Sequence, residues 1–131
     1  MTEPLTLRPR LDEIGRLQTF FTQLTERIGM AESRARQLRL ALEEAVVNVI
    51  SYGAATAIVV SAEVTDGRLV LTIDDDGRPF DPTQGSTTDL TVPADERPVG
   101  GLGIILMHQM TDALSYERVG GHNILRMEKT I

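Results

Sequence analysis

The sequence contains no cysteine and no tryptophan, and aromatic residues make up only 4% of its 131 residues. Without cysteine, the chain can form neither disulfides nor thiolate metal sites. No apolar run approaches the ~20 residues of a membrane span, and the first residues, MTEPLTLRPR, lack the apolar segment of a secretory signal. These absences lead us to expect a cytoplasmic protein with no membrane partner.

Positive charge is also scarce, because 13 Lys and Arg residues stand against 19 Asp and Glu residues and give a net charge of -6. A chain with this balance does not hold a phosphate backbone by bulk charge, so we expect no direct contact with nucleic acid. An anionic ligand would need a local binding device. The length and the 41% hydrophobic content predict a single domain, residues 1–131, around one core.

Three segments have the apolar spacing of helices. Apolar residues recur at steps of three and four over residues 11–29 and 31–52, and Gly53 stands where the second helix would stop. A shorter helical pattern covers residues 102–113.

Five segments predict strands, and they are residues 5–8, 57–65, 68–75, 114–119 and 122–129. Asp66-Gly67 and Gly120-Gly121 each separate two of them and are typical of hairpin turns. Residues 81–100 show little periodicity, and a loop of this length in a compact domain is usually a functional lid or disordered. Together these elements predict an α+β fold, a two-layer α/β sandwich with a mixed, mostly antiparallel sheet and helices on one face.

Three adjacent aspartates end the strand pattern of residues 68–75. Side chains alternate along a strand, so the apolar residues of this one share a face: Leu69, Leu71 and Ile73. The same parity puts Asp75 at the edge of the core, where a carboxylate needs a partner, and leaves Asp74 and Asp76 as solvated neighbours. The alternative, that the strand ends at Ile73 and all three aspartates cap a loop, stays open. Gly77 permits a turn or the close approach of a ligand.

A second candidate lies in ALEEAVVN, residues 41–48. Glu44 and Asn48 are one helical turn apart and share a face, whereas Glu43 lies about 140° from Asn48 around the helix. A carboxylate beside an amide oxygen suits Mg²⁺ with a base close to it. Taken alone the pair is weak evidence, because such pairs are common on solvated helices.

A third candidate is VGGLGIILM, residues 99–107, where Gly100, Gly101 and Gly103 lead directly into a helical pattern. Free backbone N–H groups at a helix start form a local anion site. The Walker and Rossmann motifs are excluded, because the segment lacks their Lys-Ser/Thr ending and their βαβ context. A plain flexible hinge is the alternative.

The fixed order of these three motifs, E-x-x-x-N, D-x-G and G-x-G, resembles the GHKL (histidine kinase-like) ATPase superfamily. Within it, the segments EAVVN, DDGRPFDP and GGLGI resemble the anti-sigma factor serine/threonine kinases. The resemblance extends from the first helix to the last strand. It implies the Bergerat ATP-binding fold, with an ATP lid at about residues 81–100.

The resemblance also assigns roles to single residues. Glu44 would be the general base, and Asn48 would coordinate Mg²⁺ at the ATP phosphates. The remaining nucleotide-binding residues would be Asp75, Gly77, Phe80, Gly101, Leu102 and Gly103. Asp75 would accept the adenine amino group, and the glycine-rich segment would place backbone N–H groups against the phosphates.

By the same resemblance the chain would be an ATP-dependent protein kinase that phosphorylates a STAS-type anti-sigma antagonist and binds a sigma factor, and so regulates transcription. A homodimer is compatible with it. One alternative is a nucleotide-binding regulatory module without significant kinase activity, and another is a degenerate relative that binds no nucleotide.

Two departures from the family pattern stand out in the sequence. Arg97 is the only basic residue of the expected lid, and the last strand, ILRMEKTI, offers no unambiguous Thr or Ser for an adenine pocket. Neither histidine, His108 or His122, precedes the ATPase motifs, so we expect both to be surface or packing residues.

Overall fold

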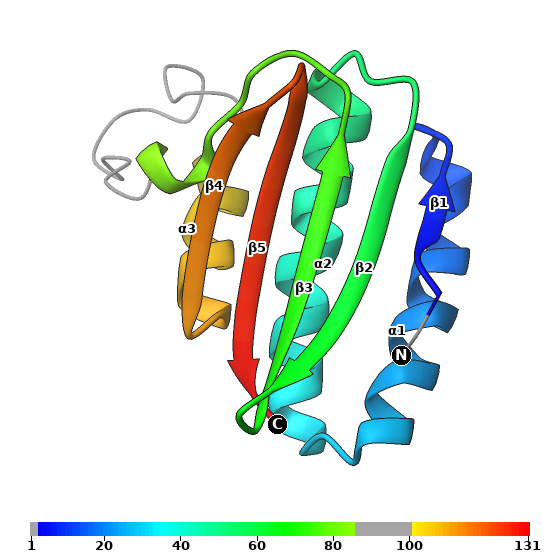
Figure 1. Ribbon diagram of the computed structural model, residues 1–131, viewed down its shortest axis with the longest axis vertical. Coiled ribbons are helices and arrows are strands. Elements are labelled where there is room, and N and C mark those ends of the chain that lie inside the picture. The colour runs from blue at the N-terminus through cyan, green and yellow to red at the C-terminus, as the bar shows by residue number, and fades with distance from the viewer. Residues whose placement is uncertain (1–2, 86–100) are drawn as a thin grey trace.

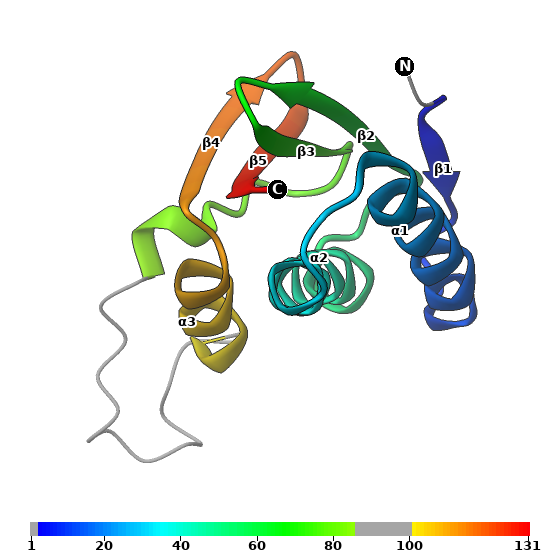
Figure 2. The same cartoon turned by 90° about the horizontal axis from the view of Figure 1, so that it is seen from below.

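The computed structural model describes residues 3–85 and 101–131, which form a sheet with helices on one of its faces (Figure 1). Seen from below, the curved sheet lies on one side of the three α-helices (Figure 2). The helical elements are η1 (Leu11–Glu13), α1 (Ile14–Ile28), α2 (Glu32–Tyr52), η2 (Pro82–Gly85) and α3 (Gly101–Met110). The strands are β1 (Leu5–Leu7), β2 (Ile58–Thr65), β3 (Arg68–Asp75), β4 (Ala113–Val119) and β5 (His122–Thr130). The predicted α+β fold is therefore confirmed. Arg97 and residues 86–100 of the expected lid lie outside the described residues.

The five strands are ordered β1-β2-β3-β5-β4, and all four described pairings are antiparallel. The sheet is therefore antiparallel throughout its described pairings, whereas the sequence predicted a mixed sheet that is mostly antiparallel. Asp66 and Gly67 turn the β2–β3 hairpin with φ angles of 51° and 73°, the positive values that a tight hairpin turn requires. The pairing of β3 with β5 places Asp75 opposite Asn123, which brings the end of β3 beside the start of the last strand.

The hydrophobic core lies between the sheet and the helices. On β3 the predicted alternation holds, because Leu69, Leu71 and Ile73 are at most 1% exposed. The stripe of α2 that meets them consists of small and branched residues: Leu38, Ala41, Leu42, Ala45 and Val46. α2 therefore packs on the sheet through this stripe. Its C-terminal half carries the candidate residues Glu44 and Asn48.

The third helix ends earlier than predicted, at Met110 instead of residue 113. The Thr111 hydroxyl donates back to the Met107 carbonyl at 2.8 Å, and the Asp112 N–H donates to the Glu128 carbonyl at 2.8 Å. Asp112 is thus already hydrogen-bonded to β5. This tertiary contact ends the helix before residue 113, although the local apolar pattern favours a longer helix.

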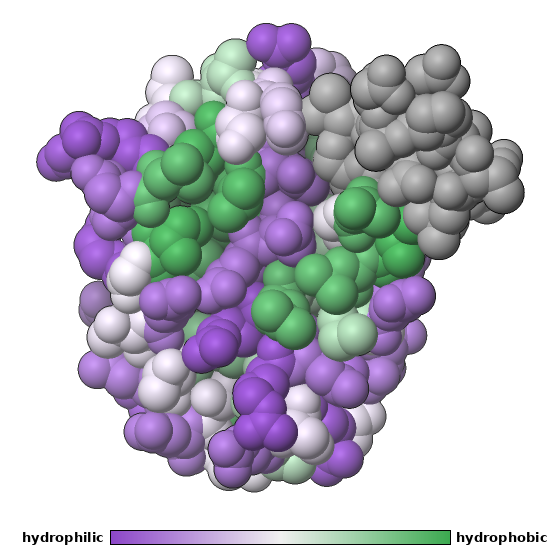
Figure 3. Space-filling view, turned by 180° about the vertical axis from the view of Figure 1, so that it is seen from behind, coloured by the Kyte–Doolittle hydropathy of each residue, from purple (hydrophilic) through white to green (hydrophobic). Residues whose placement is uncertain are grey.

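Some apolar side chains stay exposed on the helical side of the molecule. Figure 3 shows two hydrophobic areas there, separated by a polar band, and the exposed apolar residues include Leu11, Leu40 and Leu102. No helix in the described part of the chain is long and apolar enough to cross a membrane.

Candidate functional site

A cavity of about 520 Å³ lies between the C-terminal half of α2, the end of β3 and the start of β5. Its walls are mostly apolar, and they include Ala45, Val49, Ile73, Met107 and Leu125. Three of the predicted site residues line it: Asn48, Asp75 and Phe80. Mostly apolar walls with a few convergent polar groups are typical of sites for small molecules.

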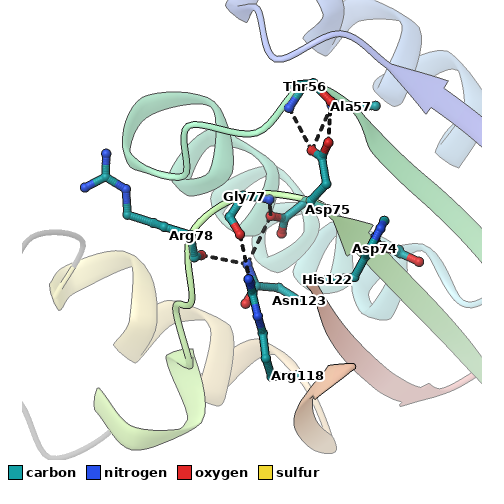
Figure 4. Close-up of polar contacts among 10 residues, drawn as sticks. Thr56, Ala57, Asp74, Asp75, Gly77, Arg78, Arg118, His122 and Asn123 are labelled. Carbon is teal, nitrogen blue, oxygen red and sulfur yellow. Dashed lines mark hydrogen bonds and ion pairs between the residues drawn. The ribbon is translucent and has the colours of Figure 1, made fainter. Parts of the chain in front are cut away.

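Asp75 is the buried aspartate of the three, with 4% of its surface exposed. Its Oδ1 accepts hydrogen bonds from the Gly77 N–H at 2.8 Å and from Asn123 Nδ2 at 3.0 Å, and Figure 4 shows both groups converging on the carboxylate. These two donors supply the partners that a buried charge requires. Both bonds fall on Oδ1, and Oδ2 has no hydrogen-bond partner among the described residues. β3 runs to Asp75, so the alternative strand end at Ile73 is wrong.

The two outer aspartates remain in contact with solvent, as expected, and each also has a structural partner. Asp74 Oδ1 lies 2.6 Å from His122 Nδ1 on the surface, which also agrees with a surface position for that histidine. Asp76 accepts from the backbone N–H groups of Thr56 at 2.7 Å and Ala57 at 3.2 Å, and from the Thr56 hydroxyl. Asp76 thereby fastens the loop between α2 and β2 to the end of β3.

These hydrogen bonds, above all those from Thr56, lower the pKa of Asp76 from 3.8 to about 2. A carboxyl whose pKa is lower in the folded state stabilises the fold above its unfolded pKa, and that contribution is lost as the pH falls through the folded value. Asp76→Asn should therefore lower stability at neutral pH, and the difference from the native chain should shrink between about pH 4 and pH 2. Urea melts across this range measure it. Asp66→Asn, which removes the same charge from an exposed turn, should show no such convergence.

Gly77 is buried, and the backbone of another loop fixes its identity. A Cβ at this position would collide with the Gly53 carbonyl oxygen and would lie 2.9 Å from Asp75 Oδ1. The next residue, Arg78, donates its N–H to the same Gly53 carbonyl at 2.7 Å. The sequence suggested a turn or a ligand as the reason for this glycine, and the described contacts add the close passage of the α2–β2 loop.

Glu44, Asn48 and Gly103 meet at the first turn of α3. A Cβ on Gly103 would touch Glu44 Oε2 and would lie 3.6 Å from Asn48 Nδ2. Asn48 is 7% exposed, and its Nδ2 has no hydrogen-bond partner among the described residues. Glu43 points elsewhere and accepts from Gln18 Nε2 at 2.7 Å. The E-x-x-x-N and G-x-G motifs, 55 residues apart from Asn48 to Gly103, are thus neighbours in space.

The two glycines should respond differently to alanine. Gly77→Ala should lower the melting temperature by several degrees, because its Cβ meets backbone that cannot move cheaply. Gly103→Ala should leave it unchanged or raise it, since the Cβ meets the ends of the Glu44 and Asn48 side chains and no backbone, and alanine favours a helix by about 1 kcal/mol. Thermal melts of both variants measure this. A larger loss in Gly103→Ala than in Gly77→Ala would contradict the contacts described.

The side-chain oxygen of Asn48 is the atom that could bind the magnesium ion that the sequence predicts, because the unpartnered Nδ2 is a hydrogen-bond donor and cannot coordinate a cation. No group of three His, Cys, Asp or Glu side chains in the described residues could hold a metal alone. Mg²⁺ commonly uses one or two protein ligands together with waters and phosphate oxygens. A buried amide oxygen beside a carboxylate and a helix start suits such a shared site, and the unpartnered Nδ2 could donate to a phosphate oxygen there.

Other predicted residues take more peripheral places. Phe80 lines the cavity and is 36% exposed, whereas Leu102 is 62% exposed and is not among the cavity residues. Gly101 is the first residue of α3. His108 Nε2 lies 3.2 Å from the Pro82 carbonyl, in agreement with a packing role.

Asn123 is the functional candidate that sequence reasoning missed. It is 5% exposed, lines the cavity and bonds to Asp75. A signal was present, because Asn123 shares the parity of Leu125 and Met127 on β5 and is therefore an amide on a core-facing row. The expectation of a Thr or Ser in the last strand passes over an amide, although Asn123 lies within the strand predicted at residues 122–129.

A two-layer domain with an antiparallel sheet, a buried D-x-G aspartate and an E-x-x-x-N helix facing a glycine-rich helix start defines the histidine kinase-like ATPase class. The family described as histidine kinase-like ATPase domain matches residues 7–129. The chain therefore belongs to this family.

Comparison with known proteins agrees. The chain is 33% identical over 110 residues to the serine/threonine-protein kinase BtrW of Bordetella bronchiseptica, with 78% of each chain covered. Its fold is similar to the crystal structure of the RsbU and RsbW domains of Rv1364c from Mycobacterium tuberculosis, with a TM-score of 0.70 at 17% identity over 98% of this chain. It is also similar to the Acinetobacter baumannii histidine kinase AdeS, with a TM-score of 0.52 at 21% identity over 73% of this chain. The chain spans 32% and 46% of these two structures.

Proposed function

We propose that the chain is an ATP-binding serine/threonine protein kinase of the anti-sigma factor type. One observation carries the proposal: a single cavity joins buried Asp75 to buried Asn48, and Asn48 lies beside Glu44 and the first turn of α3. A carboxylate, an amide and a helix start would thus lie in the order that the base, the metal ion and the phosphates of a nucleotide require.

The nucleotide would lie with its base at Asp75 and its phosphates toward Gly101 and Gly103. Asp75 Oδ2 would accept the amino group of adenine, and the apolar wall would cover the ring. Backbone N–H groups at the start of α3 would donate to the phosphates. Asn48 would hold Mg²⁺, which when bound neutralises phosphate charge.

Glu44 would act as the general base. Its carboxylate is half-buried, lies one helical turn from Asn48 and reaches the first turn of α3. From there it could accept the proton of an incoming serine or threonine hydroxyl. Catalysis would otherwise rest on positioning and on neutralisation of charge.

For the protein partners the support is similarity to BtrW, whose name states a serine/threonine-protein kinase. The phosphate acceptor would be a STAS-type anti-sigma antagonist, and a sigma factor would be the second partner. A homodimer is compatible with this arrangement.

Incubation with labelled ATP, Mg²⁺ and a candidate antagonist tests the proposal. Transfer of label to the antagonist supports a kinase. Tight ATP binding without transfer supports the alternative, a regulatory module that reports nucleotide state. If saturating ATP and Mg²⁺ leave the melting temperature unchanged, the chain is a relative that binds no nucleotide and the proposal fails.

A further inference from the structure

Asn123 makes four hydrogen bonds with its one side-chain amide. Its Nδ2 donates to Asp75 Oδ1 at 3.0 Å and to the Arg78 carbonyl at 2.8 Å. Its Oδ1 accepts from the Tyr116 hydroxyl at 2.5 Å and from the Phe80 N–H at 3.3 Å. The side chain therefore joins the end of β3, the loop after it and the neighbouring strand β4.

These partners allow only one orientation of the amide. The Arg78 carbonyl cannot donate and the Phe80 N–H cannot accept, so exchanging oxygen and nitrogen would break both contacts. Tyr116 adds a donor on the oxygen side. At 5% exposure, water cannot readily replace the lost partners. A fixed N–H donor therefore always faces Asp75.

This donor determines what Asp75 offers to a ligand. Together with the Gly77 N–H at 2.8 Å, it gives Oδ1 two donors and leaves Oδ2 as the oxygen without a partner among the described residues. Arg118 Nη1, which donates to the Gly77 carbonyl at 2.8 Å, adds a cation close by (Figure 4). The pair of Asp74 and His122 lies on the other face of the sheet, because residues 74 and 122 have the opposite parity. Asp75 is thus held in one position through Oδ1.

We propose that Asn123 is a specificity-determining residue, which holds the Asp75 carboxylate by Oδ1 so that Oδ2 accepts from the ligand, and thereby selects a purine with a 6-amino group over one with a 6-oxo group. The proposal rests on the nucleotide-binding function proposed above. A 6-amino group donates to Oδ2, whereas a 6-oxo group would place oxygen against oxygen in a buried site. Such a mismatch leaves two acceptors unpaired and is strongly disfavoured.

The test compares the affinities of ATP and inosine triphosphate, whose base has a carbonyl oxygen in place of the amino group. Calorimetry on the native chain should give a preference for ATP of at least about tenfold, the effect of one hydrogen bond to a charged group. Asn123→Asp has nearly the same shape but brings a second carboxylate to Asp75. The two carboxylates would share a proton, so Asp75 could donate to the 6-oxo group. The preference should then fall by about tenfold or more.

A second variant covers the case in which the carboxylate pair prevents folding. Tyr116→Phe removes one donor from Asn123 and leaves Asp75 itself untouched, so it should lower the preference for ATP by a smaller factor. Val119→Ala, on the same strand but exposed, is the matched control and should behave as the native chain.

The outcomes separate the two proposals. If the native chain binds neither nucleotide, the proposed function fails. If it binds ATP but the folded Asn123→Asp and Tyr116→Phe variants keep the native preference over inosine triphosphate, nucleotide binding stands and the role of Asn123 is overturned. A preference that falls in both variants at unchanged melting temperature supports that role.

Discussion

Asp75→Asn should weaken ATP binding by at least about 100-fold. The change removes the charge of a carboxylate that is 4% exposed and lines the cavity. It also puts an N–H₂ donor among groups that already donate, the Gly77 N–H and Asn123 Nδ2. Whichever way the new amide turns, a donor faces either these groups or the adenine amino group. Calorimetric titration with ATP and Mg²⁺ measures the loss.

The outer aspartates provide matched controls for this experiment. Asp74→Asn and Asp76→Asn remove the same charge from the same three-residue segment, but their partners are His122 on the surface and the α2–β2 loop. Both should retain ATP affinity within about threefold, less than the effect of one charged hydrogen bond. Equal losses in all three variants would mean that general charge, and not one positioned carboxylate, holds the nucleotide.

Glu44→Gln should leave ATP affinity nearly unchanged while slowing phosphoryl transfer by about 10²–10⁴, the usual contribution of a general base. The amide has the same shape and can still lie against Gly103, but it cannot take a proton. Single-turnover transfer of label to the antagonist, measured beside calorimetry, separates the two effects.

Glu43→Gln is the control for the base. Glu43 is the adjacent carboxylate, yet it is bound to Gln18 on α1 and should be dispensable for transfer. A Glu44→Gln chain that transfers at the native rate would exclude Glu44 as the base. If Glu44→Gln weakens ATP binding by the same factor as it slows phosphoryl transfer, Glu44 acts in binding and not as the base.

Period-two and period-3.6 patterns predicted much of the fold and singled out Asp75, Glu44 and Asn48 as candidates, whereas the roles of the site residues came from the resemblance to the GHKL superfamily. Strand parity separated Asp75 from its two neighbours, and burial on β3 follows that parity without exception. The spacing of Glu44 and Asn48 put both on one face of α2, and both lie near Gly103. These inferences succeeded because each depends on the geometry of one element.

The features that were missed depend on contacts between elements. Both the hydrogen bonds between Asp76 and Thr56 and the lack of room for a side chain at Gly77 depend on one arrangement. In it, the α2–β2 loop passes beside the end of β3. The role of Asn123 requires the register between β3 and β5. A local hydrophobic pattern shows which face a strand buries, but it does not show which residue of a distant strand lies opposite, nor the path of a loop.

The most direct test of the nucleotide site is a crystal structure of the chain with Mg²⁺ and a non-hydrolysable ATP analogue. We expect the adenine amino group within hydrogen-bond distance of Asp75 Oδ2, Mg²⁺ on the side-chain oxygen of Asn48, and the phosphates against the first turn of α3. A base bound elsewhere, or phosphates remote from Asn48 and Gly103, would contradict the account.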